Sequence, residues 1–117
     1  MRYLLLCCTN ENQWNNIPAP ERDAIMKEYG TWMQEIDRAG RHVASAQLQP
    51  TTTAATVRMK RGERIVTDGP FAETKEQLGG YHLIECADMD EATSIAARIP
   101  TLRVGGTVEV RPLAGPE

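Results

Sequence analysis

Two short apolar segments, residues 3–8 (YLLLCC) and 81–87 (YHLIECA), constrain the fold more than any other feature of the chain. Each has the length of a single β-strand; polar residues bound the first, and a Gly-Gly pair and Asp88 bound the second. Apolar side chains stand at successive positions, as in Leu4, Leu5 and Leu6, and successive side chains of a strand point to opposite faces of the sheet. We therefore predict a sheet whose two faces are both apolar and both need a cover.

A long amphipathic segment follows the first of these strands. Residues 9–19 show no period and are predicted to form a loop, whereas residues 20–39 repeat apolar side chains at helical spacing. Pro20 suits the first position of a helix, and Gly40 suits the position after its end. The apolar stripe predicts core positions rather than cofactor contacts for Ile25, Tyr29, Trp32 and Ile36.

The rest of the chain alternates strands and turns around a second helix. We predict a strand over residues 42–49, a hairpin over residues 51–67 and a last strand over residues 107–113. Asp88 and Glu91 have the spacing of a helix cap. They precede an apolar helical face formed by Ala92, Ile95, Ala96 and Ile99.

This order, β-α-β-(ββ)-β-α-β, is that of a ferredoxin-like split βαβ fold with an inserted β-hairpin. Four main strands and two helices make a two-layer α+β sandwich in one domain, residues 1–117. The helices cover one face of the sheet. A second copy of the chain is the simplest cover for the other face, because symmetric homodimers are the commonest assemblies. Such a homodimer would enclose a space in which a small-molecule ligand can bind.

Charge and cysteine content bear on the class of function. The net charge is −3, with 13 basic and 16 acidic side chains, so we expect no direct nucleic-acid binding. The apolar run at the start is too short for a membrane span, and we expect a cytoplasmic protein with no membrane partner. Cys7, Cys8 and Cys86 have no metal-ligand spacing and are expected to be small hydrophobic residues. We expect no metal and no other cofactor.

The stretch TDGPFAETKEQLGGYHLIE, residues 67–85, combines turn residues with a charged run. Asp68 can accept backbone hydrogen bonds, Gly69 permits a positive φ, and Pro70 fixes its own φ. Phe71 is then expected to hold the corner in the core, which makes the stretch a rigid turn. The alternative is a loop at the rim of a pocket that presents three charges, those of Asp68, Glu73 and Lys75.

Four segments of the chain together resemble a known family. They are AGRHVASAQLQP, DGPFAETKEQLGGYHLIE with its pair Gly79 and Gly80, DMDEA, and GGTVEVRPL. This order of motifs resembles the DGPF group of the YCII-related domain proteins over almost the whole chain. The resemblance implies a dimeric α/β barrel of ferredoxin-like protomers, similar in fold to muconolactone isomerase. It also implies a regulatory context, because such domains occur near extracytoplasmic-function sigma factors.

The resemblance does not carry a catalytic pair to this chain. Some YCII-related proteins bear a His on the first helix and an Asp before a Pro after the second helix, and these are a proposed acid–base pair. The corresponding positions here are Tyr29 and Ile99. An Ile side chain cannot orient a base, and a tyrosine of ordinary pKa is a weak base at neutral pH. We therefore favour a binding protein over an enzyme.

Other polar residues of the strands are candidates for a site. We expect His42 to be solvated and His82 to be a satisfied, half-buried histidine. Tyr81 and Glu85 share one face of a strand, and Arg111 lies on a face of the last strand. Glu85 and Arg111 are predicted to meet as an ion pair at the dimer interface, either to specify the dimer or to orient a ligand.

Three functions remain open on the sequence alone. The leading hypothesis is a homodimer that binds a small molecule or a protein, such as a sigma factor, without demonstrated catalysis. The alternative is a cofactor-free enzyme of proton-transfer, lyase or dehydrochlorinase-like chemistry, with Asp68, Tyr81, His82 or Glu85 as acid or base. A third is a structural interaction module whose cavity is filled by side chains.

Overall fold

The computed structural model describes residues 1–115, and their main sheet has four antiparallel strands in the order β2-β5-β1-β6. This order and the two long helices confirm the predicted α+β, ferredoxin-like architecture. The elements in chain order are β1 (Arg2–Thr9), α1 (Glu11–Asn15), α2 (Ala19–Arg38), β2 (His42–Gln47), η1 (Thr51–Thr53), β3 (Ala55–Lys60), β4 (Glu63–Asp68), β5 (Gln77–Glu85), α3 (Met89–Ala96), η2 (Pro100–Val104) and β6 (Thr107–Pro112).

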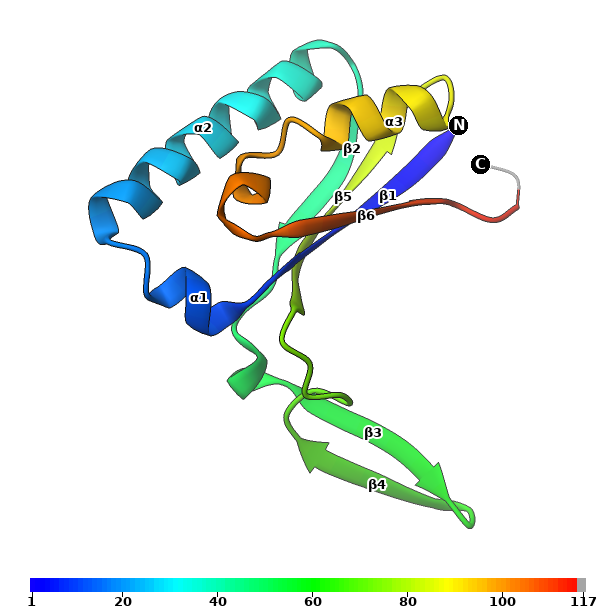
Figure 1. Ribbon diagram of the computed structural model, residues 1–117. Helices are drawn as coiled ribbons and strands as arrows, with labels where there is room; N and C mark the ends of the chain where they lie inside the picture. The colour runs from blue at the N-terminus through cyan, green and yellow to red at the C-terminus, as the bar shows by residue number, and fades with distance from the viewer. Residues whose placement is uncertain (116–117) are drawn as a thin grey trace.

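Helices α2 and α3 both lie on one face of the main sheet, which we call the helix face (Figure 1). Alternation along β1 buries Tyr3, Leu5 and Cys7 on this face, where they meet the apolar stripe of α2. The intervening residues Leu4 and Leu6 are only half-buried, because no helix of the described chain covers the opposite, open face.

Helix α2 buries the side chains that the periodicity predicts. Ile25, Trp32 and Ile36 are buried, and the Trp32 indole Nε1–H donates to the carbonyl of Ile95 at 3.0 Å, which ties α2 to α3. Gly30 lies mid-helix and exposed, and a Cβ atom there would meet nothing within 4 Å. No close packing within the described chain therefore requires this glycine.

The expected loop over residues 9–19 was wrong in part, because it contains the short helix α1. The Asn10 side chain caps this helix by accepting a hydrogen bond from the Gln13 N–H at 3.0 Å. Five residues are too few to show a hydrophobic period, and the cap was the one available signal. The predicted cap of α3 is confirmed, since Asp88 accepts from the Glu91 N–H at 2.9 Å.

Strand β5 begins earlier than its apolar run suggests, at Gln77 rather than at Tyr81. Gly79 and Gly80 therefore lie within the strand and not in a turn before it. A Cβ atom at Gly80 would stand 3.0 Å from the carbonyl oxygen of Ala46, so the close approach of β2 favours glycine there. Gly79 coincides with an irregularity in the pairing of β1 with β5.

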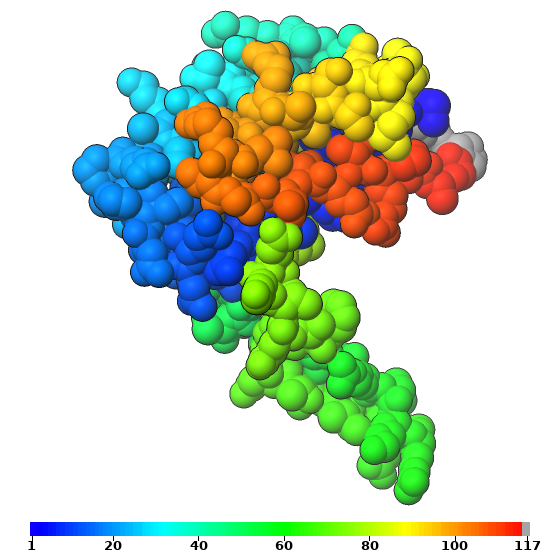
Figure 2. Space-filling view, viewed as in Figure 1, coloured from blue at the N-terminus to red at the C-terminus, as the bar shows by residue number. Residues whose placement is uncertain are grey.

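The inserted hairpin forms a separate two-stranded sheet that projects from the body of the molecule (Figure 2). Its turn at Arg61 and Gly62 has positive φ at both positions, as a tight hairpin turn requires. Phe71, which follows the hairpin, is 78% exposed, so the prediction that it holds the corner in the core was wrong. The projecting hairpin carries this corner away from the core.

Candidate functional site

A pocket of about 560 Å³ opens on the helix face, between α1, α2, β2 and the start of β5. Its apolar wall includes Met26 and Met33 of α2, and Leu48 and Leu78 lie on the sheet side. The cavity is not filled by side chains, which disfavours a purely structural module. Its volume is within the range of small-molecule sites.

Tyr29 and His82 meet at the wall of this pocket. The Tyr29 hydroxyl lies 2.5 Å from His82 Nε2. Tyr29 comes from the apolar stripe of α2, and His82 comes from the buried side of β5, opposite Leu5 of β1. The imidazole is 5% exposed and packs against the Trp32 ring, with the ring centroids 4.9 Å apart. Packing thus holds both partners of the hydrogen bond in place.

Burial keeps both members of this pair neutral. Desolvation by burial, with a smaller contribution from the nearby His42, lowers the pKa of His82 from 6.5 to about 4. Desolvation raises the pKa of Tyr29 well above its ordinary value, with the neighbouring Cys7 adding to the shift. At neutral pH the pair is therefore a phenol and a neutral imidazole that share one short hydrogen bond.

Two further atoms, Sγ of Cys7 and Nδ1 of His82, lie next to the Tyr29–His82 hydrogen bond. The Cys7 Sγ lies 3.7 Å from the Tyr29 hydroxyl, and burial raises the pKa of the Cys7 thiol, so the thiol is neutral as well. Nδ1 of His82 has no hydrogen-bond partner among the described residues, although it is fully buried. The pair therefore has hydrogen-bonding capacity that the described chain does not use.

Glu11 of α1 lines the pocket and forms two hydrogen bonds with Thr51. Its carboxylate accepts from the Thr51 N–H at 3.1 Å and from the Thr51 hydroxyl at 2.5 Å. This contact joins α1 to η1 at the base of the projecting hairpin. Glu11 is also the only ionisable carboxylate of the described lining, which contains no Lys or Arg.

The structure separates most of the candidate site residues from the pocket. Asp68 ends β4 on the hairpin, and Gly69, Pro70 and Phe71 follow it there. Glu73 and Lys75 are exposed in the next loop. None of these residues lines the described pocket, so the alternative of a loop that presents Asp68, Glu73 and Lys75 at a pocket rim is not supported. Gly79 and Gly80 do line it.

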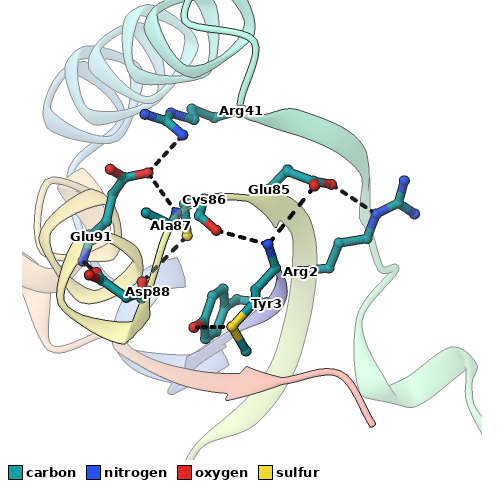
Figure 3. A network of polar contacts seen from close by, with 9 residues as sticks. Arg2, Tyr3, Arg41, Glu85, Cys86, Ala87, Asp88 and Glu91 are labelled. Carbon is teal, nitrogen blue, oxygen red and sulfur yellow. Dashed lines mark hydrogen bonds and ion pairs between the residues drawn. The ribbon is translucent and has the colours of Figure 1, made fainter. Parts of the chain in front are cut away.

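The predicted ion pair between Glu85 and Arg111 was wrong. Strand β1 lies between β5 and β6, so these residues are not on neighbouring strands. Glu85 instead accepts from Arg2 Nε at 3.1 Å and lies 3.9 Å from the N-terminal ammonium (Figure 3). Arg111 pairs with Glu109 on its own strand. Tyr81 lies on the open face with Glu85, away from the pocket.

The expectation for the two histidines changes as well. His82 is buried and belongs to the pocket. His42 is half-buried rather than freely solvated, because its Nε2 lies 3.1 Å from the Ser45 hydroxyl. Sequence reasoning missed Cys7, Glu11 and Ser45 as pocket residues. Strand alternation could have placed Cys7 on the helix face with His82, but the contacts of Glu11 span 40 positions and leave no local signal.

The described residues hold neither a cluster of three metal-ligating side chains nor a helix long and apolar enough to cross a membrane.

Comparison with known proteins identifies a family that the chain matches. The model of the YCII-related domain matches residues 1–114. A protein of Rhizobium meliloti (strain 1021), described only as uncharacterized, is 43% identical over 115 residues, which are 97% of this chain and 93% of that protein.

Proposed function

Because the chain belongs to the YCII-related domain family, we propose that it is a homodimeric member of the DGPF group that binds a small, neutral molecule in the pocket beneath α2. One observation supports this most directly. A buried, neutral Tyr29–His82 pair stands at the wall of an otherwise largely apolar cavity of about 560 Å³. A few polar groups in an apolar pocket are the usual composition of a small-molecule site.

The charge of the pocket indicates the kind of ligand. An anionic ligand would lose its hydration without meeting a cation, since no Lys or Arg stands in the described lining and Glu11 would repel it. A neutral ligand with an apolar body and one carbonyl or hydroxyl group avoids this cost. The Tyr29 hydroxyl and His82 can form hydrogen bonds with one such polar group of the ligand.

The open face of the sheet supports the homodimer. Leu4, Leu6 and Leu83 lie there with no helix over them, and the ion pairs of Arg2 with Glu85 and of Glu109 with Arg111 flank them. An apolar sheet face normally packs against a second layer. The projecting hairpin needs support too, since an isolated two-stranded ribbon is marginal in water and its Val57 and Met59 are exposed.

A second candidate is proton-transfer catalysis by the same pair. The short 2.5 Å contact favours it by aligning a phenol with an imidazole for proton exchange, whereas the lowered pKa of His82 and the raised pKa of Tyr29 make both groups weak proton carriers at neutral pH. Neither Asp68, Tyr81 nor Glu85 takes part, since all three lie away from the pocket. Ile99, at the position where the resemblance places an Asp, is 1% exposed in the core and offers no carboxylate. A link to sigma factors stays a prediction from the resemblance.

Native mass spectrometry of the protein purified from the organism that encodes it tests the proposal. We expect a dimer that carries a co-purifying molecule of a few hundred daltons, about what such a cavity holds. The pocket variant Tyr29→Phe should release this molecule, whereas Tyr81→Phe, the same change on the open face, should keep it. A monomer with no bound molecule, under conditions that preserve known weak dimers, would contradict both parts of the proposal.

A further inference from the structure

A second group of polar side chains, Ser45, His42 and Asp37, lies beside the same pocket. The three are arranged as the nucleophile, base and carboxylate of a catalytic triad are. The Ser45 hydroxyl lies 3.1 Å from Nε2 of His42. Nδ1 of His42 faces the carboxylate of Asp37, with 3.8 Å between Nδ1 and Oδ1. Ser45 is a residue of the pocket lining, and neither His42 nor Asp37 takes part in the Tyr29–His82 contact.

An irregular strand brings these residues together. His42 and Ser45 are three positions apart on β2, and regular alternation would place them on opposite faces. The pairing of β2 with β5 shifts between His42 and Ala44, which returns both side chains to one side. Asp37, in the last turn of α2, then lies beside the first residue of the strand. Bulges of this kind often occur next to active sites, where they redirect a side chain.

We propose that Ser45 is a nucleophile activated by His42, with Asp37 as the positioning residue, and that the pocket accepts a neutral ester. Each imidazole nitrogen faces the partner that such chemistry requires, with Nε2 at the hydroxyl to be deprotonated and Nδ1 at the carboxylate. The substrate class rests on the pocket assigned under the proposed function, whose described lining offers no cation to an acid.

The free edge of the sheet supplies hydrogen-bond donors near Ser45. Strand β2 is the edge strand of the main sheet, so no described strand pairs with its outer side. The Leu48 N–H donates to the carbonyl of Gly79 in β5 at 2.8 Å. By alternation from Leu48, the N–H groups of Gln47 and Ser45 point away from β5 and are free to stabilise an oxyanion.

The reaction follows in two halves. The Ser45 oxygen bonds to the ester carbonyl carbon while His42 Nε2 takes the hydroxyl proton. The carbon–oxygen bond to the alcohol then breaks, and the alcohol leaves with the proton returned by His42. Water next attacks the acyl-serine and gives a proton to His42, which passes it to the Ser45 oxygen as that bond breaks. The products are one alcohol and one carboxylic acid, and Ser45 is regenerated.

A serine-directed fluorophosphonate probe tests this inference on the full chain. The chain has two serines, and Ser94 on the exposed surface of α3 forms no hydrogen bond to a histidine of the described residues, so it is an internal control. We expect peptide mapping to find the adduct on Ser45 and not on Ser94. His42→Gln should slow labelling by at least about tenfold while the circular dichroism spectrum stays native. An unlabelled Ser45, or equal labelling of the two serines, would overturn the inference.

Turnover of p-nitrophenyl butyrate gives a second readout. Ser45→Ala should reduce hydrolysis to the rate of buffer, Asp37→Asn should lower it by about tenfold, and Asp37→Glu should restore most of it, because the carboxylate acts on His42 by charge and orientation. Hydrolysis unchanged in Ser45→Ala would contradict the assignment. If a neutral fluorescent probe still binds while Ser45 stays unreactive, the nucleophile is refuted and the binding function stands. If binding also fails, both proposals fall.

Discussion

The hydroxyl of Tyr29 on α2 and Nε2 of His82 on β5 lie 2.5 Å apart, although 53 positions separate the two residues in the chain. The resemblance noted in the sequence places Tyr29 at the position of a proposed catalytic histidine, and the structure sets a histidine of the sheet against Tyr29. The contact joins the helix layer to the sheet at the wall of the pocket, so its loss should affect both stability and binding.

Stability should depend on pH through His82. Burial lowers its pKa from 6.5 to about 4, so between these values the unfolded chain binds a proton that the folded chain does not. The free energy of unfolding should therefore rise with pH across this window. The contribution of His82 to the free energy of unfolding is complete above pH 6.5, the pKa of this residue in the unfolded chain, and it is lost as the pH falls towards 4. It amounts to about 3 kcal/mol. Urea unfolding at several pH values measures it.

The variant His82→Asn separates this effect from the titration of carboxylates, which occurs in an overlapping range. We expect the variant to be less stable at neutral pH and to show a flatter dependence between pH 4 and 6.5, the two pKa values that bound the window. Equal slopes in the two proteins would show that His82 is not the titrating group.

Gly30→Ala should stabilise the protein. The position is exposed in the middle of α2, and a new Cβ atom would meet nothing within 4 Å. Alanine lowers the backbone entropy of the unfolded chain, so the gain should be about 0.5–1 kcal/mol in chemical denaturation. A destabilised Gly30→Ala variant would contradict this prediction and indicate that another surface packs closely on this side of the helix.

Glu11→Ala should loosen the base of the hairpin. The change removes two hydrogen bonds to Thr51, and each such bond to a charged acceptor contributes about 1.5–3 kcal/mol. Amide hydrogen exchange should speed up at residues 51–54, with the Thr51 amide affected most. The substitution Glu28→Ala, which removes an exposed pair with Arg103 on the outer surface, is the control and should leave exchange there unchanged.

Leu83→Lys should dissociate the homodimer that we propose. Leu83 lies on the open face opposite Leu4, and a lysine there would be buried without a counter-charge if a second copy covers this face. We expect the dimer dissociation constant to rise by about two orders of magnitude in light-scattering chromatography. Thr93→Lys adds the same charge to the exposed side of α3 and should not alter the assembly.

The layers of the fold could be predicted because they depend on local patterns. The 3.6-residue period of α2 indicates which side of the helix is buried, and the apolar run of β1 indicates a strand with two apolar faces, independently of the rest of the chain. The hairpin was predictable for the same reason, but its direction was not. Phe71 was therefore assigned to the core, whereas the projecting hairpin leaves it in solvent.

The site could be predicted only in fragments. Tyr29 was predicted to face the core, and it packs against the core cluster. His82 was predicted to be half-buried and satisfied, whereas it is buried and its Nδ1 has no partner among the described residues. Their contact depends on how α2 lies across β5, which no local pattern encodes. The ion pair of Glu85 with Arg111 failed on strand order, because β1 separates the two strands. The contact of His42 with Ser45 could not be predicted, because it depends on a shift in the pairing of β2 with β5.

Fluorescence titration with two probes of similar shape tests most directly whether the Tyr29–His82 pocket binds a neutral ligand. N-phenylnaphthylamine is neutral and anilinonaphthalene sulfonate is anionic. We expect the neutral probe to bind more tightly, and Tyr29→Phe to weaken it about tenfold, the effect of one lost hydrogen bond, while Tyr81→Phe has none. Equal binding of both probes, or equal effects of the two substitutions, would contradict the assignment of this pocket.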